Sequence, residues 1–178
     1  NDLTVSNNAS ATVPTTLTLY GDYTNTAPVD FSANGTTTFF GTALQTATGT
    51  MTGTSAFNNV EVTNTSGTNA QSAPSIIFGA DSEFADLTAE TPGVMVQFQS
   101  AATTTMTNFN VTGADGDEVY LYSTDAATAW NVDVTGTSTI SYANVKDSNA
   151  ADNTSGTITA ATSTDATGNT NWNFGAGG

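Results

Sequence analysis

The chain is 178 residues long and strongly acidic, with sixteen Asp and Glu residues against one Lys, a formal net charge of −15 and a pI near 4.1. This charge repels nucleic acid phosphates and anionic lipid headgroups, so we expect no nucleic acid partner. The absence of His, Arg and Cys excludes the Ser-His-Asp triad, thiol nucleophiles, ordinary zinc sites and disulfides, and no apolar run is long enough to insert into a membrane.

The N-terminal segment, residues 1–13, contains one strand-like run, Leu3-Thr4-Val5. The chain begins at Asn1 without a charged and apolar leader, which is typical of a secreted protein after removal of its signal peptide and equally of a fragment of a larger protein. A strand this short is marginal alone. We therefore expect it to pair with an open sheet edge of a neighbouring subunit, as a donor strand.

Residues 14–174 contain strand-like segments that recur every 23 to 25 residues, each with an apolar residue followed by Thr. The apolar residues are Val62, Leu87, Val111, Val134 and Ile158, with weaker matches at Leu17 and Phe40. Further strand-like runs lie between them, at 75–78, 94–98, 119–122 and 140–145. Abundant Thr and Asn and scarce helix formers agree with an all-β protein.

A fixed step of this size predicts a parallel β-solenoid of about seven coils, a rod about 35 Å long. The alternative is a β-sandwich, which has short strands and frequent turns but no reason for one constant step. Residues 14–174 would form the solenoid domain and residues 175–178 a Gly-rich tail.

Equivalent positions of successive coils should stack into columns of side chains. The predicted register forms one column of Thr63, Thr88, Thr112, Thr135 and Thr159. It also stacks Glu61 on Asp86, and adjacent like charges are destabilising unless solvent or a bound cation screens them.

Three segments, Phe57 to Asn64, Trp130 to Ala150 and Ser163 to Phe174, resemble the Thr/Asn-rich β-solenoid repeats of large secreted prokaryotic surface proteins and adhesins. The resemblance implies an extracellular location at the cell surface, and a role in scaffolding or adhesion rather than catalysis. A chain without cysteine and with a single lysine also suits that location.

The densest acidic group is Asp115, Asp117 and Glu118. Hard cations such as Ca²⁺ bind several oxygen ligands from a flexible loop, so these residues are a candidate Ca²⁺ site, although they lack EF-hand spacing. The alternative is a solvated turn between strands. A looser acidic group consists of Asp81, Glu83, Asp86 and Glu90.

Two kinds of carbohydrate site are also candidates. Aromatic residues could stack on sugars, although alternation places about half of them in the core: Tyr20, Tyr23, Tyr120, Tyr122, Tyr142, Trp130 and Trp172. Paired carboxylates could hydrolyse glycosides, but nothing identifies a pair, and we predict that the protein is not an enzyme.

Glycosylation sequons occur at Asn8, Asn34, Asn64, Asn110 and Asn153.

The ends of the predicted solenoid carry no obvious cap, and exposed strand edges pair with further strands. A contact that joins the top of one copy to the bottom of the next propagates as a filament. The leading prediction is a secreted structural subunit that assembles head to tail, through Leu3, Val5, Trp172 and Phe174. The alternatives are a monomeric adhesin or glycan-binding module of a larger surface protein, and then a domain that acts on polysaccharides.

Overall fold

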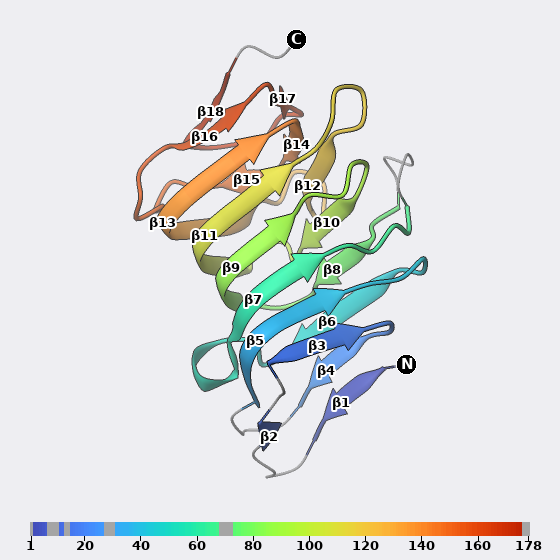
Figure 1. Ribbon diagram of the computed structural model, residues 1–178. Helices are drawn as coiled ribbons and strands as arrows, with labels where there is room; N and C mark the ends of the chain where they lie inside the picture. The colour runs from blue at the N-terminus through green and yellow to red at the C-terminus, as the bar shows by residue number, and fades with distance from the viewer. Residues whose placement is uncertain (1, 7–10, 13–14, 27–30, 68–72, 176–178) are drawn as a thin grey trace.

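The computed structural model of the protein describes residues 2–6, 11–12, 15–26, 31–67 and 73–175. The chain winds as a parallel β-solenoid (Figure 1), which confirms the predicted fold class, but with about six turns rather than the predicted seven. Every strand pairing in these ranges is parallel, so the antiparallel sandwich is wrong. The same ranges contain no α-helix, and therefore none that could cross a membrane, and only a 3₁₀ turn at Gly53–Ser55.

Two sheets face each other across the core (Figure 1). The eight-stranded sheet has the order β1 (Leu3–Val5), β4 (Tyr23–Asn25), β6 (Gln45–Gly49), β8 (Ile76–Phe78), β10 (Met95–Phe98), β12 (Val119–Ser123), β14 (Ala143–Lys146) and β17 (Thr164–Asp165). The ten-stranded sheet has the order β2 (Ala11–Thr12), β5 (Phe31–Phe39), β7 (Phe57–Val62), β9 (Ser82–Ala89), β11 (Thr103–Thr112), β13 (Trp130–Ser141), β16 (Ile158–Ala161) and β18 (Trp172–Phe174). In addition, β3 (Thr16–Leu19) pairs with β5, and β15 (Ser148–Asn149) pairs with β13.

Successive coils differ in length. Tyr23, Ala47, Phe78 and Phe98 are neighbours in register, so these three steps are 24, 31 and 20 residues. The predicted period of about 24 therefore describes the average coil and not each coil. The long step contains the connection between β7 and β8.

Because of these unequal coils, the predicted columns are wrong. Val60, not Val62, pairs with Leu87, and Glu61 pairs with Thr88 rather than Asp86. Further along, Val111 pairs with Ile140 and not with Val134, after a register irregularity between Met106 and Asn108. The stacked pair of carboxylates and the threonine column consequently do not form.

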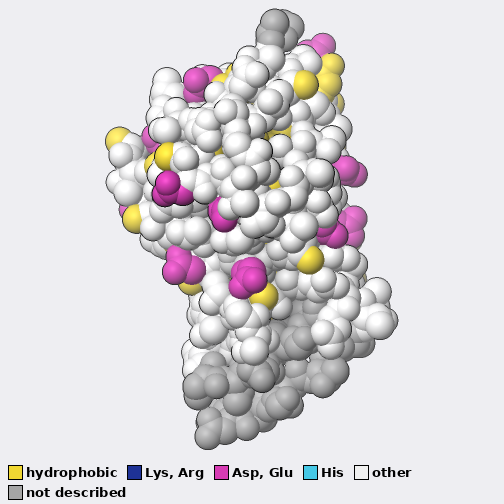
Figure 2. All heavy atoms as spheres, turned by 90° about the vertical axis from the view of Figure 1, so that its left-hand side faces the viewer, with side chains coloured by type: hydrophobic (Ala, Val, Ile, Leu, Met, Phe, Trp, Pro, Cys, Tyr) yellow, Lys and Arg dark blue, Asp and Glu magenta, His cyan; other side chains and the backbone are white. Residues whose placement is uncertain are grey.

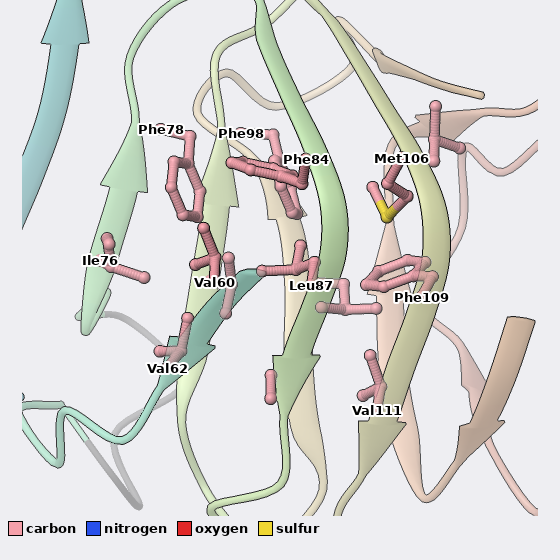
Figure 3. Packing of buried hydrophobic residues seen from close by; sticks show 14 of the residues in the cluster. Val60, Val62, Ile76, Phe78, Phe84, Leu87, Phe98, Met106, Phe109 and Val111 are labelled. Carbon is pink, nitrogen blue, oxygen red and sulfur yellow. The ribbon is translucent and has the colours of Figure 1, made fainter. Parts of the chain in front are cut away.

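The assignment of side chains to the inside and the outside is nevertheless confirmed. All five apolar residues that defined the period are buried, and the residues on either side of each face outward. Figure 3 shows side chains of the two sheets packed between the strands, among them Phe78 and Phe98 from one sheet and Phe84 and Leu87 from the other. A column of rings continues through the core, ending where Phe98 stacks on Trp130 at 4.1 Å. The weaker match at Phe40 is wrong, because Phe39 is the buried residue and Phe40 is 46% exposed.

Left-handed residues form the corners of the coils. Ala101, Ala127, Asp147 and Thr167 each have positive φ and lie just after β10, β12, β14 and β17. At a second corner, Tyr142 has a φ of 49° and separates β13 from β14. The predicted strand run 140–145 is therefore two strands with a corner between them.

The N-terminal strand belongs to the solenoid of its own chain. Leu3 pairs with Tyr23 and Val5 with Asn25, so β1 extends the eight-stranded sheet. Val5 is 7% exposed, and Leu3 packs against the core. This pairing corrects the prediction of a strand given to a neighbour, because the core of its own subunit already holds these two side chains.

Candidate functional site

The outer face of the ten-stranded sheet carries two continuous columns of short polar side chains. In the first, the residues Thr36, Asn59, Asp86, Asn108 and Thr137 are consecutive neighbours in register. The second lies two residues further along each strand and contains Thr38, Glu61, Thr88, Asn110 and Thr139. We call these ten residues the polar face.

The polar face is hollowed into a shallow groove of about 520 Å³ that extends across β5, β7, β9, β11 and β13. Eight of its ten residues line the groove, the exceptions being Thr38 and Thr139. The site is positioned by strand alternation: Leu87, Phe109 and Val111 point into the core and hold their neighbours Asp86, Thr88 and Asn110 outward.

A ladder of hydrogen bonds between coils stabilises the first column. The Asn108 side-chain amide donates to Asp86 Oδ1 at 2.5 Å, and the Thr137 hydroxyl donates to Asn108 Oδ1 at 2.8 Å. In the second column, the Thr38 hydroxyl donates to Glu61 Oε2 at 3.3 Å. Amide and hydroxyl donors thus bind both carboxylates of the groove, and the two carboxylates are not neighbours in register.

Two exposed rings stand beside this face. Phe40 lies two residues beyond Thr38, next to the end of β5, and Tyr20 holds the matching place after β3. Tyr20 is 61% exposed, and its ring meets that of Phe40 edge to face at 5.3 Å. Of the aromatic residues that the sequence suggested for sugar stacking, Tyr23 and Trp130 are in the core, and Tyr20 is the most exposed. Phe40 was not among those suggested.

The candidate Ca²⁺ residues separate into a turn and a side-chain network. Asp115 and Asp117 lie in the turn between β11 and β12, where Ala114 and Asp117 form an isolated bridge. Glu118 accepts hydrogen bonds from the Asn144 amide at 3.0 Å and the Thr164 hydroxyl at 2.6 Å. Across the ranges that the structure describes, no three acidic side chains gather closely enough to hold a metal ion. Ca²⁺ binding at this turn stays a prediction.

The looser acidic group is used in bonds between coils. Asp81 accepts from the backbone of Thr103 at 2.7 Å, Glu83 from the backbone of Gly53 at 2.8 Å, and Asp86 belongs to the ladder. Glu90 is exposed beyond the end of β9. These four carboxylates therefore do not converge on one site.

The single lysine lies on the opposite sheet, within an aromatic and polar network. Lys146 Nζ lies 5.9 Å from the centre of the Tyr122 ring. The Tyr122 hydroxyl donates to Asn144 Oδ1 at 2.8 Å. Burial, then the nearby Tyr120 and Glu118, raises the pKa of Tyr122. Hydrogen bonds thus join Tyr122, Asn144 and Glu118 to one another, which indicates a structural role for this network.

The sequons occupy different environments. Asn64 is fully buried, and its amide donates to Ala43 O and Gln45 Oε1 at 2.7 Å. Asn153 is 8% exposed and bonds the backbone of Val134. In the folded protein neither amide is open to modification, whereas Asn34 is exposed and Asn110 lies in the groove. Asn8 lies outside the described residues.

Trp172 and Phe174 lie on β18, the last strand of the ten-stranded sheet. Both are partly buried against the core, and their rings stack at 5.9 Å with an interplanar angle of 14°. The Trp172 indole donates to Ser148 Oγ at 3.1 Å.

The comparisons with known proteins identify no relative. No family model, no curated protein and no solved structure matches this chain.

Proposed function

We propose that the protein is a secreted structural subunit whose copies stack end to end into an extracellular filament or surface layer. The observation that carries the proposal is the pairing of the outermost strands. Within the described part of the chain, β1 and β17 pair on one side only, with β4 and β14, and β18 pairs only with β16. Strand edges of this kind accept further parallel strands.

The backbone of β1 supports this reading in detail. Leu3 N donates to Asp22 O at 2.8 Å, and Val5 O accepts from Thr26 N at 3.0 Å, so residues 3 and 5 bond to the body of the solenoid. In a parallel ladder, the intervening residue directs its N–H and C=O to the other side. Thr4 therefore presents a donor and an acceptor to whatever lies beyond β1.

Apolar side chains at the two ends complement this edge. Leu3 and Leu17 are partly buried at the first coils, and Trp172 and Phe174 at the last. A second copy in axial register would cover both groups and add their apolar area to the main-chain hydrogen bonds. Because the contact joins unlike ends, it would repeat without closing.

The extracellular setting rests on composition. The chain has no cysteine, and its one lysine, Lys146, lies over the ring of Tyr122. Such a surface offers little to oxidants or to proteases that cut after basic residues. The many hydrogen bonds between coils, which use hydroxyl and amide side chains, suit a protein with a structural role.

The test is the substitution Thr4→Pro, with Thr4→Val as its control. Proline removes the outward N–H of β1 and is tolerated on an edge strand, whereas valine keeps that N–H. We expect the protein and Thr4→Val to form filaments in negative-stain images and to increase in mass with concentration in light scattering. Thr4→Pro should keep its circular dichroism spectrum and remain monomeric. Isolated rods of the unaltered protein, or filaments of Thr4→Pro, would overturn the proposal.

A further inference from the structure

We propose that the polar face binds a neutral, linear polysaccharide, which lies along the solenoid axis and crosses β5, β7, β9, β11 and β13 in turn. The inference is independent of end-to-end stacking, because it concerns the side of the solenoid and not its ends. It rests on four features of this face: its free polar groups, its charge, its regular spacing and the pair of exposed rings beside it.

The groove offers hydrogen-bonding groups that the fold does not use. Among the residues that the structure describes, the side chains of Asn59, Thr88 and Asn110 have no hydrogen-bond partner, and all three line the groove. An amide both donates and accepts, and a hydroxyl does the same. Sugar hydroxyls need such groups, while the carboxylates of Glu61 and Asp86 supply strong acceptors.

The charge of the face selects a neutral ligand. Both ionisable groups in the groove, Glu61 and Asp86, are acidic, and Lys146 lies on β14 of the other sheet. An anionic polysaccharide or a second copy of this acidic chain would meet repulsion here without a cation to offset it. A neutral hydroxyl-rich chain instead donates hydrogen bonds to the two carboxylates. On the face shown in Figure 2, acidic side chains are likewise scattered among polar atoms, with no basic group in view.

The spacing of the face suits a repeating ligand. Parallel strands recur about every 4.8 Å, so the five strands offer two rows of equivalent groups over about 19 Å. The rings of an extended, β-linked polysaccharide recur at close to the strand interval. Each sugar can therefore meet a short polar side chain at the same place on successive strands, which favours a polymer over a single sugar.

Tyr20 and Phe40 provide the apolar contact that polar rows alone lack. The C–H faces of a pyranose ring stack on aromatic rings. Both rings are exposed, and Leu44, which is 48% exposed, follows Phe40 in the chain. Because Phe40 continues the outward row of Thr36 and Thr38 just after the end of β5, a sugar chain in the groove has these rings at its flank.

Affinity electrophoresis tests the proposal with named polymers: hydroxyethylcellulose and glucomannan as neutral β-linked chains, and polygalacturonate as the anionic comparison. We expect at least one neutral polymer to retard the protein and polygalacturonate to leave it unretarded. Retardation by none of the neutral polymers, or by polygalacturonate most strongly, would overturn the proposal.

Variants on the two sheets test whether the polymer binds at the polar face. Asn110→Ala should weaken binding about fivefold, as expected for one lost hydrogen bond. Gln97→Ala should leave it unchanged, because Gln97 is a half-buried, outward amide of β10 on the opposite sheet. Phe40→Ala should weaken binding about fivefold and Phe40→Tyr restore it. Equal affinity of Asn110→Ala and the unaltered protein contradicts the site. Thr4→Pro should bind the polymer normally, so failure of stacking and failure of sugar binding remain distinguishable.

Discussion

Gly49 illustrates how a single residue can be fixed by both backbone conformation and space. Its φ is +89°, and a Cβ added there would lie 1.9 Å from Asn25 O. Gly116 also has a positive φ, +76°, but a Cβ added at Gly116 would have no atom within 4 Å. We therefore expect Gly116→Ala to lower the free energy of unfolding by about 1 kcal/mol, which is the left-handed penalty alone.

Gly49→Ala adds a clash with backbone and should lower the free energy of unfolding by about 3 kcal/mol or more. Chemical denaturation of the two variants in parallel measures the difference. Similar losses of stability for both variants would contradict the prediction, because the backbone at Asn25 would then have to move away from the added Cβ at little cost.

Tyr23 gives the protein a pH dependence at the alkaline end. Its side chain is fully buried at the N-terminal part of the core, and burial raises its pKa from 10.0 to about 12. Below pH 10 the phenol is neutral in both folded and unfolded states, so the whole stabilisation is present. As the pH rises from 10 to 12, the unfolded chain ionises first and stability falls, by up to about 2 to 3 kcal/mol.

Denaturant titrations at several alkaline pH values, compared with Tyr23→Phe, measure this effect. The fall between pH 10 and 12 should be smaller in the phenylalanine variant, because its ring cannot ionise. The other tyrosines ionise in both proteins, so the difference between the two curves isolates Tyr23. Parallel curves would contradict the assignment.

At the scale of the strand, alternation decides which residues tolerate charge. Val111 is fully buried on β11 between Ala89 and Ile140, and its neighbour Asn110 faces the groove. Val111→Asp would place an unpaired carboxylate in the core and lower the free energy of unfolding by several kcal/mol, about 3 or more. Asn110→Asp should change stability by less than about 1 kcal/mol. Thermal melts followed by circular dichroism compare the pair, and equal damage would mean that the inward and outward faces of β11 are exchanged.

The same alternation explains what the sequence could and could not predict about the strands. Apolar residues recurring before Thr predicted the inner face correctly, because a slip by an even number of residues leaves every side chain on its own face. The register was lost, as with Val60 in place of Val62 beside Leu87, because it depends on the lengths of loops. Left-handed corners such as the one at Tyr142 also escaped prediction, because Tyr142 is not a glycine and no turn sequence marks its position.

The candidate site shows this limit at the scale of the whole molecule. Asn108-Phe109-Asn110 and Thr36-Thr37-Thr38 each place two outward polar residues around an inward one, which is a local signal. That the two triplets share a groove follows only from their register with the strands between them. The surroundings of Glu118 could not be predicted for the same reason, because Asn144 and Thr164, which donate hydrogen bonds to it, belong to later coils.

The net charge of −15 acts on the molecule as a whole. The acidic side chains of the described ranges do not gather in threes, so their repulsion is spread along the rod. Salt weakens such repulsion, since the Debye length falls from about 30 Å at 0.01 M to about 10 Å at 0.1 M. We expect the melting temperature to rise over this range in NaCl, and equal rises in NaCl and in CaCl₂ at matched ionic strength would leave screening as the only effect. A larger rise with Ca²⁺, lost on EDTA addition and in Asp117→Asn, would instead show a specific calcium site at the turn that holds Asp115 and Asp117.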